Sequence, residues 1–198
     1  MWQRFTDPAR KIVYYAQVEV EKRGVTDVAA EHLLLGLLRQ VTEAKAAWPP
    51  APTDRVDPHD IAASLLRHVD IEGLRTDLDR QIAWLALPIK AENQIELLPS
   101  GKQVIDASYK EALRLLSKSI TPEFLLLGMF GDGAGKAGAL LTQSGLDLVT
   151  AREAVASVYQ PAQENRTMET NAKERNLTIW SRLFSKRIVD APSEKETR

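Results

Sequence analysis

Apolar side chains recur along most of this chain at steps of three and four residues, which is the spacing of one face of an α-helix. The first such face is made by Ile12, Val13, Ala16 and Val20. The hydroxyl and early proline of Thr6-Asp7-Pro8 predict its start, and Gly24 predicts its end. Further faces predict helices over residues 31–39, 61–69, 71–82, 99–118, 122–130, 137–144 and 146–159. No segment has the strict alternation of a strand, so we expect an all-α fold.

One part of this helical pattern occurs twice. The stretch Glu31-His32-Leu33-Leu34-Leu35-Gly36-Leu37 returns 92 residues later as Glu123-Phe124-Leu125-Leu126-Leu127-Gly128-Met129. The same offset matches Phe5 to Leu97, Arg10 to Lys102, Glu19 to Glu111 and Val28 to Ile120. A fixed offset is the signature of a duplicated structural unit. We therefore expect two tandem four-helix repeats related by a pseudo-two-fold axis, with the repeated leucines in the core.

Polar and proline-marked segments divide the chain. Residues 87–96 form a linker between repeat one, residues 2–86, and repeat two, residues 97–160. The helical pattern fails between Gln40 and His59, and the prolines that follow Trp48 predict an exposed loop there. Trp48 either packs back onto the body or is available to a partner.

Residues 161–198 have a different composition and predict a polar linker followed by an amphipathic tail helix. The apolar stripe of that helix includes Leu177, Ile179, Trp180, Leu183, Phe184 and Ile188. Trp180, Leu183 and Phe184 are candidate partner-binding residues. The stripe could dock onto its own domain, bind a partner protein, associate with a second copy or lie on a membrane surface. These alternatives, and the oligomeric state, stay open.

Charge and composition exclude several classes of protein. Lys plus Arg number 26 and Asp plus Glu number 27, and this net charge of −1 argues against a nucleic-acid binder. The absence of cysteine excludes disulfides and thiolate metal sites. No run approaches the roughly 18 apolar residues of a membrane span, and the first residues lack the apolar core of a signal peptide. We expect a cytoplasmic protein without integral membrane association.

No pattern indicates catalysis, a cofactor or a metal. The three histidines lack the spacing of metal ligands, and no hydroxyl has a recognisable His/Asp relay. The glycines at 131–135 are followed by Lys136, as in a phosphate-binding loop, but Phe130 and Ala137 stand where that motif needs glycine and Ser or Thr. We expect neither an enzyme nor a cofactor-binding protein.

The segments Phe5-Thr6, Ala9-Arg10 and Glu31-His32-Leu33-Leu34-Leu35-Gly36-Leu37-Leu38 resemble the Clp repeat (Clp R) domain. This is the N-terminal domain of the Clp/Hsp100 unfoldases, and the resemblance is to the ClpC and ClpA type. The glycine turn and closing helices of the second copy are similar to the same family. The resemblance covers about residues 2–160. No AAA+ ATPase module follows in this sequence, so we expect a free-standing Clp N-domain.

The resemblance implies that Glu31 and Glu123 bind arginine-like groups, including phosphoarginine, at two related surface sites, with Thr6 as a further site residue. A carboxylate suits a guanidinium because it accepts paired hydrogen bonds. The alternative is that both acids only complement helix dipoles. The chain also departs from the family, because Ala30 and Leu98 stand where threonines are usual and Phe124 replaces a histidine. The lost threonines disfavour phosphoarginine more than they disfavour peptides in general.

The function that the resemblance implies is protein binding without catalysis. We expect an adaptor or regulator of Clp-dependent unfolding or proteolysis, with Clp unfoldase or peptidase subunits and substrate proteins as partners. The alternative is a protein-interaction or stress-sensing module unconnected to proteolysis that assembles through the tail helix.

Overall fold

The computed structural model describes residues 2–25, 27–47, 61–84 and 96–159. The chain divides into two compact units, Met1–Val158 and Tyr159–Arg198, and nearly all described residues belong to the first. Trp48, the residues of the expected tail helix and almost all of the expected 87–96 linker lie outside the described residues. The predictions made for them therefore stay predictions.

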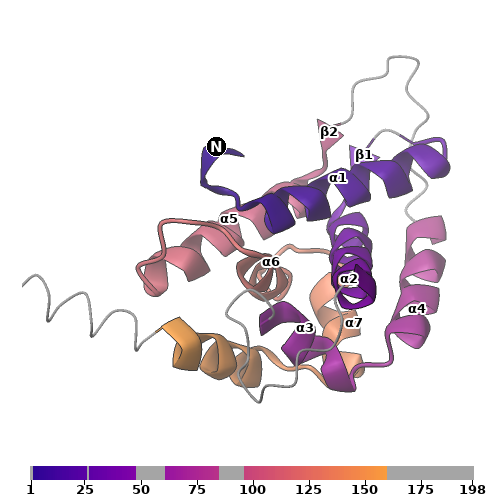
Figure 1. The fold of residues 1–198 in the computed structure, drawn as a ribbon. Helices are drawn as coiled ribbons and strands as arrows, with labels where there is room; N and C mark the ends of the chain where they lie inside the picture. Colours follow the sequence, from indigo (N-terminus) through magenta and orange to yellow (C-terminus); the bar gives the residue numbers. More distant parts are fainter. Residues whose placement is uncertain (1, 26, 48–60, 85–95, 160–198) are drawn as a thin grey trace, which may run out of the picture. The chain divides into compact units, whose positions relative to one another are not determined.

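The described part of the chain is mostly helical, as predicted (Figure 1). Its elements in chain order are a 3₁₀ turn at Trp2–Arg4, α1 at Asp7–Lys22, β1 at Asp27–Val28, α2 at Ala30–Ala47, α3 at Ile61–Leu65, a 3₁₀ turn at Leu66–His68, α4 at Ile71–Trp84, β2 at Glu96–Leu97, α5 at Pro99–Arg114, α6 at Pro122–Gly128 and α7 at Ala137–Gln143. A last helix covers residues 148–159. None of the described helices is long and apolar enough to cross a membrane.

Two short parallel contacts join the repeats to each other. Val28 of β1 pairs with Leu97 of β2, and Phe5 forms a parallel bridge with Ile120. The amide of Leu98 donates to the Val28 carbonyl at 2.9 Å, and the amide of Thr6 donates to the Ile120 carbonyl at 3.0 Å. The 92-residue offset relates the two contacts to each other, because it matches Val28 to Ile120 and Phe5 to Leu97. The segment before the second helix of each repeat therefore pairs with the segment before the first helix of the other repeat.

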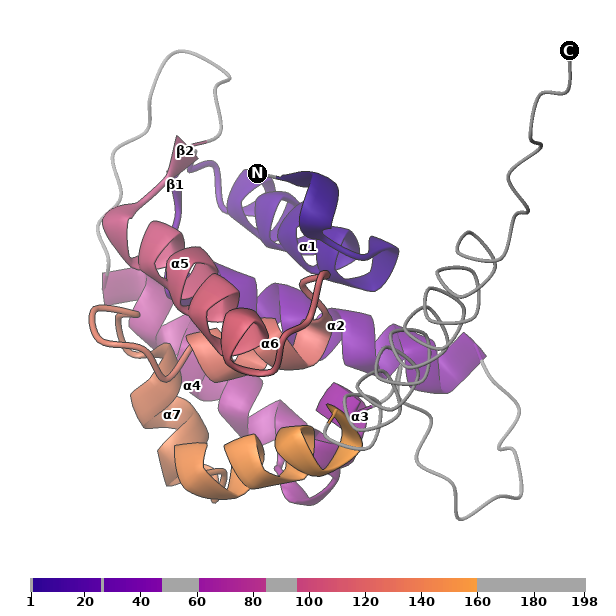
Figure 2. The same ribbon diagram turned by 90° about the vertical axis from the view of Figure 1, so that its left-hand side faces the viewer.

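Helices also pack across the boundary between the two repeats. Within the repeats α1 packs on α2 and α5 packs on α6, while α3 of repeat one packs on α6 and α7 of repeat two packs on α2 and α4. Figure 2 shows α5 and α6 in front of α1 and α2, with β1 beside β2. The described residues thus form the pseudo-two-fold arrangement that the repeated sequence predicts.

The repeated leucines and glycines hold the helix pairs together. Leu33, Leu34, Leu125 and Leu126 are fully buried, as predicted. A Cβ atom on Gly36 would overlap the carbonyl oxygen of Ile12, and glycine is therefore needed where α2 crosses α1. The matched Gly128 lies equally close to α5, since a Cβ there would come within 2.5 Å of the Val104 carbonyl oxygen.

Some predicted boundaries were wrong. The pattern predicted an irregular segment from Gln40 onward, but α2 continues to Ala47. Val41 is 2% exposed and extends the apolar face by another turn, and the Thr42 hydroxyl donates to the Leu38 carbonyl at 2.8 Å, which satisfies it within the helix. The predicted helix over 99–118 ends at Arg114, and Leu116 turns the chain with a φ of 50°.

Candidate functional site

A pocket of about 390 Å³ lies between the start of α1 and the start of α6. It brings together two of the predicted site residues, Thr6 and Glu123, which are far apart in the sequence. Its wall consists of Phe5, Thr6, Asp7, Pro8, Thr121, Pro122 and Glu123. We call this hollow the Thr6–Glu123 pocket.

Backbone pairing between the repeats positions Thr6 in this pocket. Its amide and its hydroxyl both donate to the carbonyl of Ile120, at 3.0 Å and 3.3 Å. Thr6 is the N-cap residue of α1, as predicted, but its hydroxyl makes no capping hydrogen bond to that helix. The hydroxyl is used in the pairing between the repeats, which fixes how the chain approaches the start of α1.

The pocket is rich in oxygen atoms that accept hydrogen bonds. Glu123 lies in the first turn of α6 and is 1% exposed, whereas the Asp7 side chain is 87% exposed and pairs with Arg10 at 3.2 Å. One buried and one exposed carboxylate therefore flank the threonine hydroxyls. This combination suits a cationic group that donates several hydrogen bonds, such as a guanidinium.

Glu31, the third predicted site residue, does not line this pocket. It is 2% exposed and Glu123 is 1% exposed, although both acids were expected at the surface. Its Oε1 accepts a hydrogen bond from the backbone amide of Lys136 at 2.6 Å, and its buried Oε2 has no hydrogen-bond partner among the described residues. Its role in ligand binding stays a prediction.

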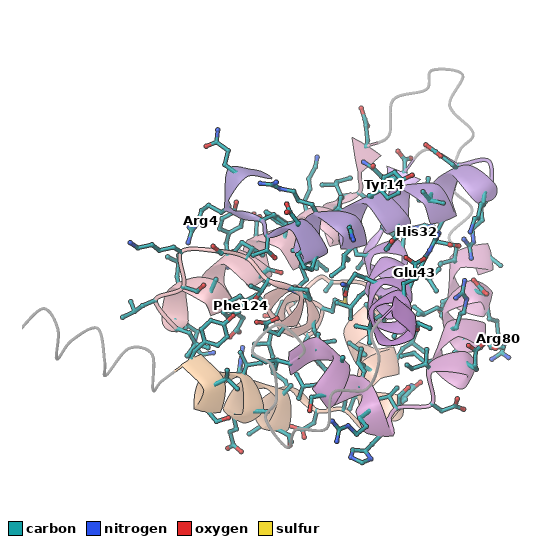
Figure 3. The ribbon with its side chains drawn as sticks, viewed as in Figure 1. Arg4, Tyr14, His32, Glu43, Arg80 and Phe124 are labelled. Carbon is teal, nitrogen blue, oxygen red and sulfur yellow. The ribbon has the colours of Figure 1, made fainter. Side chains whose placement is uncertain are left out.

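His32 follows Glu31 and lies completely inside the fold (Figure 3). Its Nδ1 accepts a hydrogen bond from the amide of Ala29 at 3.1 Å, so the proton of the neutral ring is on Nε2. Burial, together with the smaller effect of the positive charge of Arg23, lowers the pKa of His32 from 6.5 to about 4. The imidazole is therefore neutral at physiological pH and is buried in the core of the domain.

The family model for the Clp repeat (R) N-terminal domain matches residues 56–144 and, overlapping them, residues 96–175. Together these matches cover more than half of the chain. The chain belongs to the Clp N-terminal repeat family.

Curated relatives of this Clp N-domain are much longer proteins. The ClpA homolog of Guillardia theta, an ATP-binding subunit of the ATP-dependent Clp protease, is 28% identical over 196 residues, which are 98% of this chain and 21% of that protein. The negative regulator of genetic competence ClpC/MecB of Bacillus subtilis is 29% identical over 155 residues, or 78% of this chain and 17% of that protein. The chain thus spans about a fifth of the length of these relatives.

Solved structures show the same fold. The N-terminal domain of Hsp104 from Candida albicans aligns with a TM-score of 0.56 at 14% identity, covering 79% of this chain and 91% of that one. The N-terminal domain of the chaperone ClpD from Arabidopsis thaliana aligns with a TM-score of 0.50 at 22% identity, covering 79% and 98%. At these identities the likeness shows the fold alone.

The Clp N-domain also has two buried acids, Glu19 and Glu111, which match each other under the 92-residue offset. The sequence did not indicate the partners of either acid. Glu19 is 4% exposed and pairs with Lys22 at 3.0 Å and Arg23 at 2.8 Å. Burial alone would raise the pKa of Glu19, but hydrogen bonds from Arg23 and Lys22 outweigh it and lower the pKa. The matched Glu111 is 8% exposed and accepts from Arg152 Nε at 3.1 Å. The contacts of Glu19 with Lys22 and Arg23 lie at the end of α1, whereas the contact of Glu111 with Arg152 joins α5 to the last helix.

A second hollow, of about 700 Å³, lies beside α1 and the start of α5. Its wall includes Arg10 and Lys102, which match under the offset, together with the apolar Val13, Val28 and Leu97. No cluster of His, Asp and Glu in the described ranges could hold a metal ion. Mixed apolar and charged hollows of this kind suit the side chains of a peptide.

Proposed function

We propose that this Clp N-domain is a non-catalytic protein-binding domain that acts as an adaptor or regulator in Clp-dependent protein unfolding or proteolysis. Its partners would be substrate proteins and the subunits of a Clp unfoldase or peptidase. Family membership supports the connection to Clp, and relatives bear the names of a Clp protease ATP-binding subunit and of the chaperone ClpB. The Thr6–Glu123 pocket is the single observation that carries the binding role.

The ligand that best fits this pocket is an arginine-like side chain on a peptide. Glu123 and Asp7 supply carboxylates, and a guanidinium presents five N–H donors in a fixed fork. A phosphorylated guanidinium would also need a cationic or amide-rich neighbour for its phosphoryl group. The exposed carboxylate of Asp7 opposes that charge, so plain arginine is expected to bind at least as well as phosphoarginine.

The experiment is a pull-down from native lysate with the full chain as bait. The matched variants are Glu123→Gln, which removes the buried charge of the pocket, and Glu153→Gln, which removes an exposed charge outside it. Recovery of a Clp ATPase or peptidase by the unmutated chain and by Glu153→Gln, with reduced recovery by Glu123→Gln, is expected. Repeated absence of Clp subunits in all three samples contradicts the proposal. The pure chain is expected to show no ATP hydrolysis, and turnover would contradict its non-catalytic character.

A further inference from the structure

The first helix of repeat one ends in a Schellman motif. The amide of Gly24 donates to the Glu21 carbonyl at 3.0 Å, and the amide of Val25 donates to the Val20 carbonyl at 3.3 Å. This motif needs a left-handed residue directly after the helix, which is usually glycine, and Gly24 has a φ of 68°. A Cβ atom on Gly24 would meet no atom within 4 Å. A side chain at this position would therefore point into open space.

Helix α5 of repeat two ends in the same motif, at the positions that match under the 92-residue offset. The amide of Leu116 donates to the Leu113 carbonyl at 3.0 Å, and the amide of Ser117 donates to the Ala112 carbonyl at 2.9 Å. Leu116 stands where repeat one has Gly24, and its φ is 50°. Side chains disfavour this left-handed backbone, because the Cβ atom comes too close to a carbonyl oxygen. Leucine is therefore a less stable choice than glycine at position 116.

Packing returns little for this unfavourable backbone, because Leu116 is 69% exposed. The described residues have four exposed large apolar side chains, and two of them, Leu113 and Leu116, lie only three residues apart. Repeat one has the exposed acid Glu21 at the position that matches Leu113. Repeat two thus presents two leucines to solvent at the place where repeat one presents an acid and a glycine.

The exposed charges in this stretch are positive. Lys110 and Arg114 are exposed on the last turns of α5, and Lys118 is exposed in the turn that follows. The one acid between residues 107 and 119 is Glu111, which is 8% exposed and accepts from Arg114 at 3.2 Å. We call the surface made by Lys110, Leu113, Arg114, Leu116 and Lys118 the α5-end surface.

Arg4 holds the turn that presents Leu116. Its Nε donates to the Lys118 carbonyl at 3.0 Å, and its Nη2 donates to the Ser117 carbonyl at 2.9 Å. The guanidinium also lies over the ring of Tyr109 on α5, 5.3 Å from the ring centroid (Figure 3). The backbone around Leu116 is therefore fixed before any partner arrives, which lowers the entropic cost of binding there.

We propose that the α5-end surface binds a partner protein through a short segment that carries both apolar and acidic side chains. The two leucines supply apolar contact area, and the three cations complement acids. None of these five residues lines the Thr6–Glu123 pocket. The inference therefore concerns a separate surface and does not depend on the proposed adaptor role.

Peptide binding to the full chain tests the chemistry of the partner. The probes are a labelled peptide of leucine and glutamate residues and a peptide of equal length made of leucine and lysine residues, followed by fluorescence anisotropy. We expect the acidic peptide to bind at least tenfold more tightly than the basic one, and its affinity to fall as salt is added. Leu113→Glu combined with Leu116→Gly introduces the residues of repeat one and is expected to weaken binding at least tenfold. Equal affinities for the two peptides, or an unchanged affinity in the double variant, overturns the proposal.

Thermal melting separates loss of binding from loss of fold. Leu116→Gly is expected to raise the melting temperature by about 2–4 °C, because glycine tolerates the left-handed backbone, and at the same time to weaken binding of the acidic peptide. The matched control is Gly24→Leu, which is expected to lower the melting temperature by a similar amount and to leave peptide binding unchanged. A melting temperature in Leu116→Gly that stays the same or falls would show that the leucine serves the fold, and this overturns the proposal.

Two further measurements test other occupants of the α5-end surface. Analytical ultracentrifugation of the full chain tests a second copy, and cosedimentation with phosphatidylserine vesicles tests an anionic membrane. We expect Leu116→Gly to change neither result. Self-association or vesicle binding that Leu116→Gly abolishes would assign the surface to that occupant and overturn the proposal.

Discussion

Acidification is expected to destabilise this domain through one buried side chain, His32. The imidazole is 0% exposed and accepts a hydrogen bond from the Ala29 amide through Nδ1. Protonation would turn this acceptor into a donor that faces another donor, and it would place a charge in the core. The charged groups that act on it are Arg23, which lowers its pKa, and Glu19, which raises it to a smaller extent.

The size of the effect follows from the difference between the two pKa values. The unfolded histidine titrates near 6.5 and the folded one near 4, so the unfolded chain binds more protons between these limits. Stability therefore falls as the pH falls through this window and is independent of His32 above it. The full shift corresponds to about 3 kcal/mol, of which about 2 kcal/mol is lost between pH 7 and pH 5. For a chain of this length that is a fall in melting temperature of roughly 4–8 °C.

The assay is urea unfolding of the full chain at closely spaced pH values from 7 to 5, followed by circular dichroism. The chain itself suggests the variant, since Phe124 occupies the matched position of repeat two and is fully buried. His32→Phe is expected to flatten the pH dependence in this window, whatever its stability at pH 7. His68→Ala removes an exposed histidine and is expected to leave the dependence unchanged.

Two results would refute this reasoning. The first is a free energy of unfolding that stays constant between pH 7 and pH 5, which would mean that His32 titrates normally. The second is an unaltered pH dependence in His32→Phe, which would assign the effect to another group. Glu19 does not contribute to the pH dependence in this window, because its pKa lies below that of an ordinary glutamate. The domain loses the stability that Glu19 provides only at more acidic pH.

Further predictions concern helix packing. Gly36→Ala and Gly128→Ala are each expected to lower the free energy of unfolding by about 1–3 kcal/mol, because the added methyl overlaps the backbone of the neighbouring helix. Unchanged midpoints of urea unfolding would contradict this close approach. Arg152→Ala is expected to cost about 1–3 kcal/mol, because it leaves the 8% exposed Glu111 with fewer donors. Arg114→Ala, at the 59% exposed second partner of Glu111, is the control and should cost less; equal urea midpoints would contradict the difference.

Much of the fold was predictable because the sequence pattern that specifies it occurs twice in the chain. The offset between Glu31 and Glu123 identified the repeats, and the apolar spacing placed the leucines in the core. The helix starts at Pro8 and Pro122 also followed from local chemistry, since proline near the first turn needs no donor. These features depend on neighbours in the sequence, and local patterns are sufficient to predict them.

The features that escaped prediction depend on the other repeat. An acid in the first turn of a helix is ordinarily solvated, so nothing local to Glu31 or Glu123 indicated that both are almost fully buried. Glu31 is buried because a turn 105 residues away covers it. The extension of α2 past Gln40 likewise has a partner outside the helix, since Glu43 accepts from the hydroxyl of Tyr15 on α1 as well as from Arg39 of its own helix.

The reciprocal pairing also decides which site a substitution affects. Because Thr6 pairs with the segment before α6, a change at the start of repeat one alters the site at Glu123, which belongs to repeat two. Leu98 of repeat two likewise pairs with Val28, which precedes the helix of repeat one that carries Glu31. The surroundings of each matched acid are therefore built from both repeats. The close contacts at Gly36 and Gly128, by contrast, lie within each repeat, where they hold the helix pairs together.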